Sequence, residues 1–263
     1  MRIPVVVSGA CGRMGTIIRS MLAESTAFSL VGALERTNHP LLGRKLEQSV
    51  ILTSELPPGD YVVIDFSSPE GTLNLLRQTK NPLVIGTTGL TEETRNLMEK
   101  LSASTAIVWA ANMSIGVYCF FQIVKRAAEL LKDYEVEILE THHHHKKDAP
   151  SGTAREIARI VCEAKKLTPE SSLRFGRSGF TGERKPEEIG IHAMRLADIV
   201  GEHSVFFGKT GEVIELSHRC FNRASFAAGA LQAASFVWKK SPGLYTMEDV
   251  IEEKKGEENV VRE

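Results

Sequence analysis

The sequence has 263 residues, with 42% hydrophobic side chains, 25% charged side chains and a formal net charge of −1. This length suits one large domain or two modest ones, and the near-zero charge gives no general attraction to nucleic acid or acidic membranes. Residues 1–10 are too short and glycine-interrupted for a signal peptide, and no apolar run approaches the roughly 20 residues of a membrane span. The four cysteines form no CxxC pair, which indicates neither a zinc site nor a disulfide framework. We therefore expect a cytoplasmic protein without nucleic-acid or membrane partners.

Short apolar strands alternate with helices in the first part of the chain. The strand 3–7 runs into a glycine-rich turn, and the helix 13–23 that follows has apolar residues at helical spacing. The remaining strands of this part are expected at 30–34, 61–66, 83–85 and 106–109, with a helix at 92–101. Such alternation is typical of a parallel sheet with helices on both faces, so the predicted fold class is α/β.

The pattern changes after Ser114. A long amphipathic helix is expected at 117–132 and another at 153–166, with an alternating strand at 135–140 between them. Three further strands are expected at 189–196, 203–207 and 212–216, which predicts a second sheet of mixed or antiparallel type. The apolar helical pattern 224–238 predicts a return to the first domain.

A glycine-rich turn joins the first strand to the first helix. Its spacing is G-x-x-G-x-x-G, and Cys11 stands where a second glycine is usual in G-x-G-x-x-G. Glycines let the backbone turn sharply and approach a pyrophosphate, whose charge the helix N-terminus favours. Glu35 ends the second strand, where an acidic side chain binds ribose hydroxyls. Arg36 suits a 2′-phosphate or the adenine, so the pair predicts that NADH and NADPH are both accepted; a solvated strand end is the alternative.

Further cofactor contacts are expected where the fourth and fifth strands end. Ligands of open α/β sheets bind at the carboxyl ends of the strands, and small residues there leave room for a nicotinamide ring and its ribose. Ordinary turn and capping chemistry explains these residues equally well. The candidate cofactor-binding residues are Gly9, Ala10, Cys11, Gly12, Arg13, Met14, Glu35, Arg36, Gly86, Thr87, Thr88, Ala110, Ala111, Asn112 and Met113.

Four histidines and two lysines precede a Ser-Gly-Thr sequence at the start of a helical pattern. Imidazoles titrate near neutral pH and transfer protons, and a lysine supplies a fixed charge or an acid. Ser151 is expected to cap the helix, which leaves the N–H groups of Gly152 and Thr153 available to a carboxylate. These parts together suit an acidic substrate that is protonated during a reaction.

The four histidines cannot all have the same role. On an extended segment His142 and His144 would share one side and His143 and His145 the other, and two of the four are expected to be surface or structural residues. Consecutive histidines rarely converge on one ion, so no metal site is predicted. For Lys146 and its neighbour, a solvated face is the alternative to a catalytic role.

These motifs resemble those of the 4-hydroxy-tetrahydrodipicolinate reductase family, formerly called dihydrodipicolinate reductase, of bacterial and plant lysine synthesis. The resemblance covers almost the whole chain. The matching segments are Gly9–Gly15, Gly86–Gly89, Ala110–Gly116, Glu140–Lys146, Asp148–Ala154, Thr181–Arg184, Asp198–His203 and Ser217–Arg219. The histidine–lysine segment joined to the Ser-Gly-Thr sequence is highly specific, whereas the glycine motif alone is not.

The resemblance implies a role for each part of the chain. It implies a Rossmann-type dinucleotide-binding domain at 1–113 and 224–263, with an inserted α+β domain at 114–223. The inserted domain would bind substrate through a mixed sheet and form a homotetramer. The resemblance also implies the site residues: His142 and Lys146 as proton donors, and His143, Ser151, Gly152 and Thr153 as substrate contacts. Cys11 replaces a common glycine of the family, and His144 stands where arginine is frequent.

The predicted reaction is the NAD(P)H-dependent reduction of (2S,4S)-4-hydroxy-2,3,4,5-tetrahydrodipicolinate, a cyclic dicarboxylate, to tetrahydrodipicolinate and water. Loss of water gives a conjugated imine, hydride adds at C4, and protonation completes the product. Two alternatives are another two-domain nicotinamide dehydrogenase, such as aspartate dehydrogenase, and a non-catalytic protein that senses NAD(P) or binds metal. Neither alternative requires an anion site beside a pair of proton donors.

Overall fold

The structure is a computed structural model that describes the backbone of residues 2–260 and the side chains of residues 2–253. The chain divides into two compact units. Unit 1 comprises Met1–Ile115 and Arg223–Glu263, and unit 2 comprises Gly116–Asn222. Residues 261–263, at the end of the predicted first domain, lie outside the described residues. None of the helices within 2–260 combines the length and hydropathy needed to cross a bilayer.

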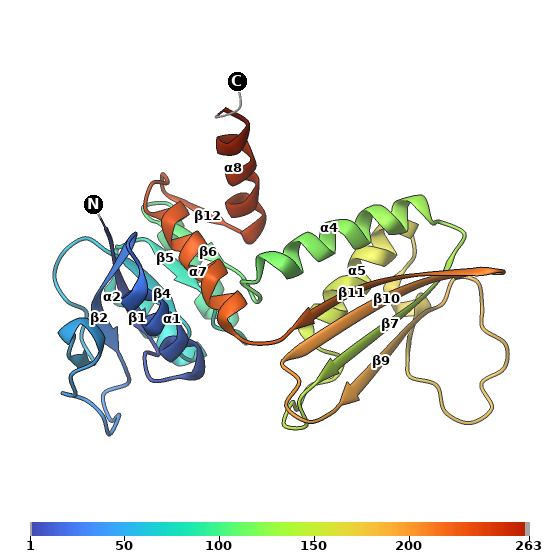
Figure 1. The fold of residues 1–263 in the computed structure, drawn as a ribbon, viewed down its shortest axis with the longest axis horizontal. Coiled ribbons are helices and arrows are strands. Elements are labelled where there is room, and N and C mark those ends of the chain that lie inside the picture. Colours follow the sequence, from blue (N-terminus) through green and yellow to red (C-terminus); the bar gives the residue numbers. More distant parts are fainter. Residues whose placement is uncertain (1, 261–263) are drawn as a thin grey trace. The chain divides into compact units, whose positions relative to one another are not determined.

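Unit 1 is built on a seven-stranded sheet in the order β12-β6-β5-β4-β1-β2-β3, and every pairing in it is parallel (Figure 1). Its strands are β1 Ile3–Ser8, β2 Phe28–Leu34, β3 Leu52–Thr53, β4 Val62–Asp65, β5 Leu83–Ile85, β6 Ala106–Trp109 and β12 Gly243–Tyr245. The five strands expected from the sequence are present, and β3 and β12 are additions at the two edges. The strand order reverses between β1 and β4, which is where ligands bind in a doubly wound sheet.

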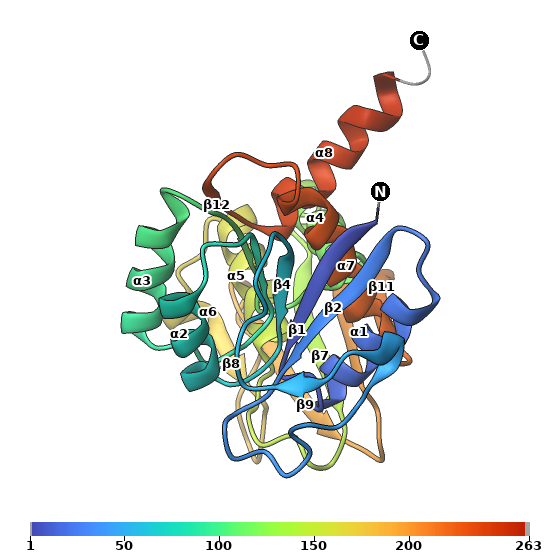
Figure 2. The same ribbon diagram turned by 90° about the vertical axis from the view of Figure 1, so that its left-hand side faces the viewer.

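Helices cover both faces of this sheet (Figure 2). α1 Arg13–Glu24 and α7 Ala224–Val237 lie on one face, and α2 Pro69–Gln78 and α3 Glu92–Ser102 lie on the other. The unit also contains the short 3-10 helix η1 Glu47–Ser49 and the C-terminal helix α8 Met247–Val260. The α/β class predicted from the alternation of strands and helices is confirmed.

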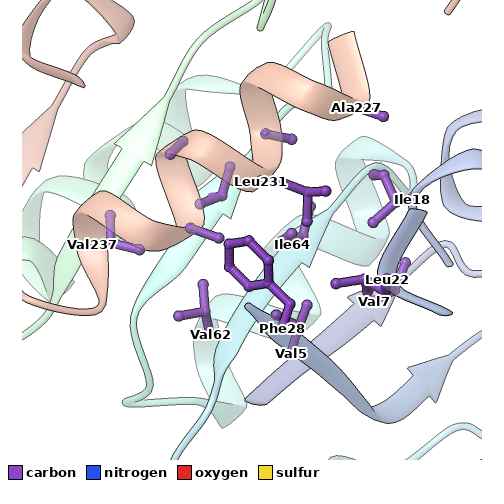
Figure 3. Close-up of a cluster of buried hydrophobic side chains, with 14 of the residues drawn as sticks. Val5, Val7, Ile18, Leu22, Phe28, Val62, Ile64, Ala227, Leu231 and Val237 are labelled. Carbon is purple, nitrogen blue, oxygen red and sulfur yellow. The ribbon is translucent and has the colours of Figure 1, made fainter. Parts of the chain in front are cut away.

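Alternate residues of β1 enter the two layers of the core. Val5 and Val7 pack with residues of α1 and α7, whereas Val6 packs with residues of α2 and α3. All three are fully buried, and burial of a side chain of this size contributes about 1.5–3 kcal/mol. Figure 3 shows the first layer, in which Leu231 of α7 lies over Ile64 of β4. A central strand buried on both faces fixes the position of the turn that follows it.

Unit 2 contains a five-stranded mixed sheet in the order β11-β10-β7-β9-β8 (Figure 1). Its strands are β7 Glu135–His142, β8 Leu173–Phe175, β9 Ile189–Arg195, β10 Gly201–Lys209 and β11 Glu212–Cys220. β10 pairs antiparallel with β7 and β11, whereas β9 pairs parallel with β7 and β8. α4 Ile115–Leu130 and α5 Gly152–Lys165 pack on one face, and α6 Pro169–Ser172 is a single turn. The predicted second sheet is therefore of the mixed type.

Candidate active site

The glycine-rich turn after β1 lies at the point where the strand order of unit 1 reverses. Gly9 has φ +73°, and a Cβ added there would lie 2.6 Å from the backbone oxygen of Phe66. A Cβ on Gly15 would lie 2.2 Å from the backbone oxygen of Gly9, so the first turn of α1 sits directly on the glycine turn. Gly12 is the N-cap of α1 and provides no side-chain cap, and the first turn of the helix has no acidic residue. This is the shape and polarity that a pyrophosphate group requires.

Two further contacts hold the turn in place. The backbone N–H of Cys11 donates to Oε1 of Glu35 at 2.9 Å, which places that carboxylate beside the turn. Inside the unit, Nε of the buried Arg19 donates to the backbone oxygen of Ala10 at 2.9 Å, and its Nη1 pairs with Glu47. The sequence does not single out Arg19, because it looks like an ordinary polar residue of a helix. Its contacts show that it supports the turn from behind.

The other predicted cofactor residues lie at the same edge of the sheet. Gly86, Thr87 and Thr88 follow β5, and the segment 110–113 follows β6, which pairs with β5 in parallel. Thr87 is buried, and its hydroxyl donates to Oδ2 of the fully buried Asp65 at 3.0 Å. The Thr87 hydroxyl is thus held within the protein, so a ligand there meets backbone groups and the exposed Thr88. Glu35 and the exposed Arg36 follow β2 at this edge too.

His142 is the last residue of β7 in unit 2. Its Nδ1 lies 2.5 Å from Oε2 of Glu140, which is fully buried. A carboxylate at Nδ1 fixes the proton on that nitrogen, so Nε2 is the atom that accepts or gives a proton. A Cβ added at Gly201 of β10 would lie 3.0 Å from Nε2. Glycine at this position therefore leaves space beside Nε2 of His142.

Glu140 is held by a network of donors. Nη1 and Nη2 of Arg195 each donate to one of its oxygens at 2.9 Å, and the backbone N–H of Ser151 donates to Oε1 at 3.0 Å. Burial raises the pKa of Glu140, but the hydrogen bonds from His142 and Arg195 outweigh it and lower the pKa to about 2. Glu140 is therefore ionised near neutral pH. Its carboxylate lies against Nδ1 of His142, a contact that residue spacing alone does not reveal.

Ser151 caps α5 from a buried position. Its Oγ accepts from the backbone N–H of Ala154 at 3.2 Å and lies 3.1 Å from Nε2 of His203. Burial first, and then the nearby His142, lower the pKa of His203 to about 3, so this imidazole is neutral. In the tautomer that carries its proton on Nδ1, neutral His203 accepts a hydrogen bond at Nε2 from the Ser151 hydroxyl, which leaves the Oγ lone pairs for the cap. The helix N-terminus at Gly152 begins immediately after this cap.

The remaining histidines do not continue the strand. Residues 143–145 form a turn closed by the Lys146 N–H and the His143 backbone oxygen, so the side-to-side alternation expected after His142 is wrong. The backbone hydrogen bonds of this turn form in place of the strand pairing that would extend β7 past His142. His144 is exposed, and its Nδ1 lies 2.7 Å from the backbone oxygen of Ala197.

Lys146 lies close to the site on the same turn. Its Nζ donates to both carboxylate oxygens of Asp148, at 2.8 and 3.0 Å, and this contact lowers the pKa of Asp148. The contacts of Glu140 place His142 beside Ser151 at the start of α5, and Lys146 follows His142 by four residues on the turn. Unit 2 can therefore present a proton-transfer group, an ammonium group and a helix N-terminus to one anionic ligand.

Comparison with known proteins identifies the family. Residues 3–113 match the family model described as dihydrodipicolinate reductase, N-terminus, and residues 116–251 match the model for its C-terminus. The chain belongs to the dihydrodipicolinate reductase family. Members of this family use NADH or NADPH, and the matched N-terminal part is their dinucleotide-binding domain. The family and the Rossmann-type fold predicted from the sequence motifs are confirmed.

Relatives and solved structures agree with this assignment. The chain is 41% identical over 260 residues to the 4-hydroxy-tetrahydrodipicolinate reductase of Syntrophus aciditrophicus (strain SB), covering 94% of this chain and 97% of that protein. The protein of the same name from Anaeromyxobacter dehalogenans (strain 2CP-C) is 40% identical over 261 residues, with 94% and 97% covered. The structure of dipicolinate-bound dihydrodipicolinate reductase from Paenisporosarcina sp. TG-14 gives a TM-score of 0.72 at 26% identity, covering 94% of this chain and 98% of that one. The aspartate dehydrogenase alternative is not favoured.

Proposed function

We propose that the chain catalyses the reduction of 4-hydroxy-tetrahydrodipicolinate to tetrahydrodipicolinate and water with NADH or NADPH. Unit 1 binds the dinucleotide and unit 2 binds the dicarboxylate. One observation carries the proposal: an ionised carboxylate, Glu140, contacts His142 in the unit that also contains Lys146 and the helix N-terminus at Gly152. Relatives that are about 40% identical to this chain over nearly their whole length are named as this reductase.

The residues of unit 1 fit the dinucleotide. The N–H groups of Arg13 and Met14, at the start of α1, face the pyrophosphate, and the cradle formed by Gly9 and Gly15 leaves no room for side chains there. The N–H groups of residues 10–12 instead bond within the protein and hold the turn. Glu35 accepts from the ribose hydroxyls, and Arg36 pairs with a 2′-phosphate when NADPH is bound. Segments 86–88 and 110–113 hold the nicotinamide end. The bound cofactor supplies the hydride, while this chain positions it and excludes water.

In unit 2, His142 moves the proton. Its Nδ1 keeps the hydrogen bond to Glu140. Its Nε2 gives a proton to the ring carbon next to the one that receives the hydride. The negative charge of Glu140 stabilises the imidazolium before transfer, and Arg195 keeps that carboxylate ionised. Lys146 provides a second acidic group and a positive charge for the dianionic substrate.

The start of α5 binds a substrate carboxylate. Gly152 and Thr153 are the first two residues of the helix, where an N-terminus favours an anionic group. The helix dipole adds a favourable interaction with negative charge there. His143 provides a further substrate contact. Ser151 acts by capping the helix rather than by touching the substrate, because its buried hydroxyl bonds to Ala154 and His203.

Self-association and cellular location are part of the proposal. β11 is an edge strand with Val213 66% and Ile214 38% exposed, and unpaired edges with apolar side chains favour association of copies. We assign this surface to a homotetramer, which size-exclusion chromatography with light scattering tests. None of the four cysteines forms a disulfide within the described residues, which supports the proposal of a reducing cytoplasm.

The activity is tested by nicotinamide absorbance. The substrate is generated in place by an aldolase-type synthase from pyruvate and aspartate semialdehyde, and NADH and NADPH are compared. Loss of absorbance that requires both this protein and the synthase is expected. Folded protein that binds NADH but does not consume it would contradict the proposed substrate, while oxidation of NADH with another substrate would point to a different dehydrogenase.

A further inference from the structure

Three potential metal ligands of different chemistry meet beside the glycine turn of unit 1. Cys11, Glu35 and His39 each offer one ligand atom, and these atoms all lie within 4.8 Å of one another. The three residues come from the turn after β1, the end of β2 and the reverse turn that follows β2. All three are half-buried, so a solvated ion can reach them. Hydride transfer has no use for a thiol or an imidazole at this place.

The backbone around the three side chains is fixed by hydrogen bonds. The Glu35 N–H donates to the Thr53 backbone oxygen at 2.9 Å, and one carboxylate oxygen of Glu35 accepts from the Cys11 N–H at 2.9 Å. The His39 N–H donates to the Arg36 backbone oxygen at 2.9 Å. The contact to Cys11 uses Oε1 of Glu35, so Oε2 can serve as a ligand without breaking it. The site therefore needs side-chain rotation and no change of the backbone path.

The donor set selects the ion. Magnesium and calcium prefer oxygen ligands, whereas a thiolate, an imidazole and a carboxylate together suit Zn²⁺. Zinc bonds of about 2.0–2.3 Å place tetrahedral ligands roughly 3.3–3.7 Å apart. The three atoms, already within 4.8 Å, reach this spacing by small rotations of half-exposed side chains. His39 Nδ1 makes only a long contact of 3.3 Å with the Leu41 N–H, which does not prevent such a rotation.

We propose that Cys11, Glu35 and His39 bind one Zn²⁺ ion, with water as the fourth ligand, and that the bound ion excludes the dinucleotide. The thiol proton leaves to solvent as Sγ becomes a thiolate ligand, and no electron is transferred. Exclusion follows because the carboxylate that receives the ribose hydroxyls is the one that ligates the metal. This second half rests on the cofactor contact proposed above for Glu35.

Binding is tested on the full-length, reduced, metal-free protein. Zn²⁺ affinity is measured by competition with a chromophoric chelator, and Co²⁺ is used as a spectroscopic replacement. The ligand variants are Cys11→Ser and His39→Gln, and the matched control is the double variant His144→Gln, His145→Gln, which removes exposed histidines of unit 2. We expect one Zn²⁺ per chain in the wild type and the control, with affinity at least about 10-fold weaker in each ligand variant. The Co²⁺ form should show a thiolate-to-cobalt charge-transfer band that is absent in Cys11→Ser.

Exclusion is tested by titrating NADH, followed by nicotinamide fluorescence, with and without saturating Zn²⁺. We expect Zn²⁺ to raise the Kd for NADH at least about 10-fold in the wild type and to have no such effect in His39→Gln. Zn²⁺ affinity that is unchanged in Cys11→Ser and His39→Gln, or a Co²⁺ spectrum without the sulfur band, overturns the metal site. Bound Zn²⁺ with unchanged NADH affinity overturns exclusion. Glu35→Ala without metal tests the cofactor contact separately, because it should weaken NADH whether or not the zinc site exists.

Discussion

The two candidate sites of this chain are built in different ways. The cofactor site of unit 1 depends on backbone shape: Gly9 and Gly15 are close in the sequence and leave no space for a Cβ. The site of unit 2 depends on side chains that meet across strands, since Glu140 and Arg195 lie 55 residues apart. A backbone site is damaged by adding atoms, and a network site is damaged by removing charges or hydrogen bonds. Substitutions that do one or the other therefore test this comparison.

The largest effect is expected from His142→Ala. This variant removes the proton-transfer group, so kcat should fall by about 10²–10⁴-fold while KM changes little. NADH affinity, which depends on unit 1, should stay at the wild-type level. Steady-state kinetics and NADH titration measure the two quantities. The exposed neighbour His145→Ala is the control and should keep wild-type kcat; equal losses in both variants would remove His142 from the mechanism.

Glu140→Gln is the next strongest change. It keeps the shape of the side chain but removes the charge that stabilises protonated His142, so kcat should fall roughly 10–100-fold. The pH profile of kcat/KM should also shift, because the group that backs His142 is no longer ionised. If Glu140→Gln keeps both the stability and the pH profile of the wild type, Glu140 does not position or charge-stabilise His142.

The same carboxylate gives unit 2 a characteristic acid sensitivity. The pKa of Glu140 is lowered from 4.5 to about 2, so its contribution to stability is present above pH 4.5 and is lost as the pH falls from 4.5 towards 2. Glu137, paired with Arg177 and Arg184, is lowered to about 2 as well and acts in the same direction. Urea unfolding at pH 7, 4.5 and 3 should show a decline in stability that is less steep in Glu140→Gln. An identical decline in both proteins would contradict this assignment.

Gly15→Ala tests the backbone site. The added Cβ would lie 2.2 Å from the Gly9 oxygen, and the helix must shift to relieve the contact. Overpacking of this kind costs about 1–3 kcal/mol, which corresponds to roughly 10–100-fold weaker NADH binding if the shift occurs at the turn. Thr16→Ala, at the next and exposed position of α1, is the control. NADH affinity equal in the two variants would contradict the close packing of α1 on the turn.

The difference between the two sites also decides which of their features the sequence predicts. The glycine turn, Glu35 and the strand ends lie in short, continuous patterns, so their shared edge of the sheet follows from parallel topology. The strands β3 and β12 have two and three residues, too few to show a pattern. Glu140 lies in the family motif, yet nothing in its spacing shows that it pairs with Arg195. Such pairings depend on the register of β7 with β9, which places the two strands side by side.

The histidine run is a second case in which the local sequence pattern does not predict the structure. Extended alternation predicts two faces for residues 142–145, but the strand ends at His142 and a turn follows. The decisive contacts are the backbone bonds of His142 and His144 to residues 196 and 197. Those partners lie more than 50 residues away, so a local pattern cannot reveal them. The identity of the reactive histidine therefore follows from the resemblance and from the Glu140 contact, not from periodicity.

Gly201→Ala adds an atom to the site of unit 2, which otherwise depends on charges and hydrogen bonds. The new Cβ would lie 3.0 Å from Nε2 of His142, so it would crowd the nitrogen that transfers the proton. We expect kcat to fall by about 10-fold with little change in NADH affinity. Gly208→Ala on the same strand is the control, because its Cβ would meet only Val213 at an ordinary 3.7 Å. Equal kcat values for the two variants would show that the space beside Nε2 is not used.

The smallest effects are expected from replacing two helix caps, and comparing the two variants tests the substrate site. Ser151 and Thr91 each accept from the N–H three residues later at 3.2 Å, the first at the start of α5 and the second at the start of α3. Replacing either by alanine should lower the free energy of unfolding by about 0.5–2 kcal/mol. Only Ser151→Ala should also raise KM for the dicarboxylate, by several-fold, because its hydroxyl joins His203 to the helix start that binds the substrate. If both variants lose the same stability and keep the same KM, the start of α5 is a structural helix end and the substrate carboxylate binds elsewhere in unit 2.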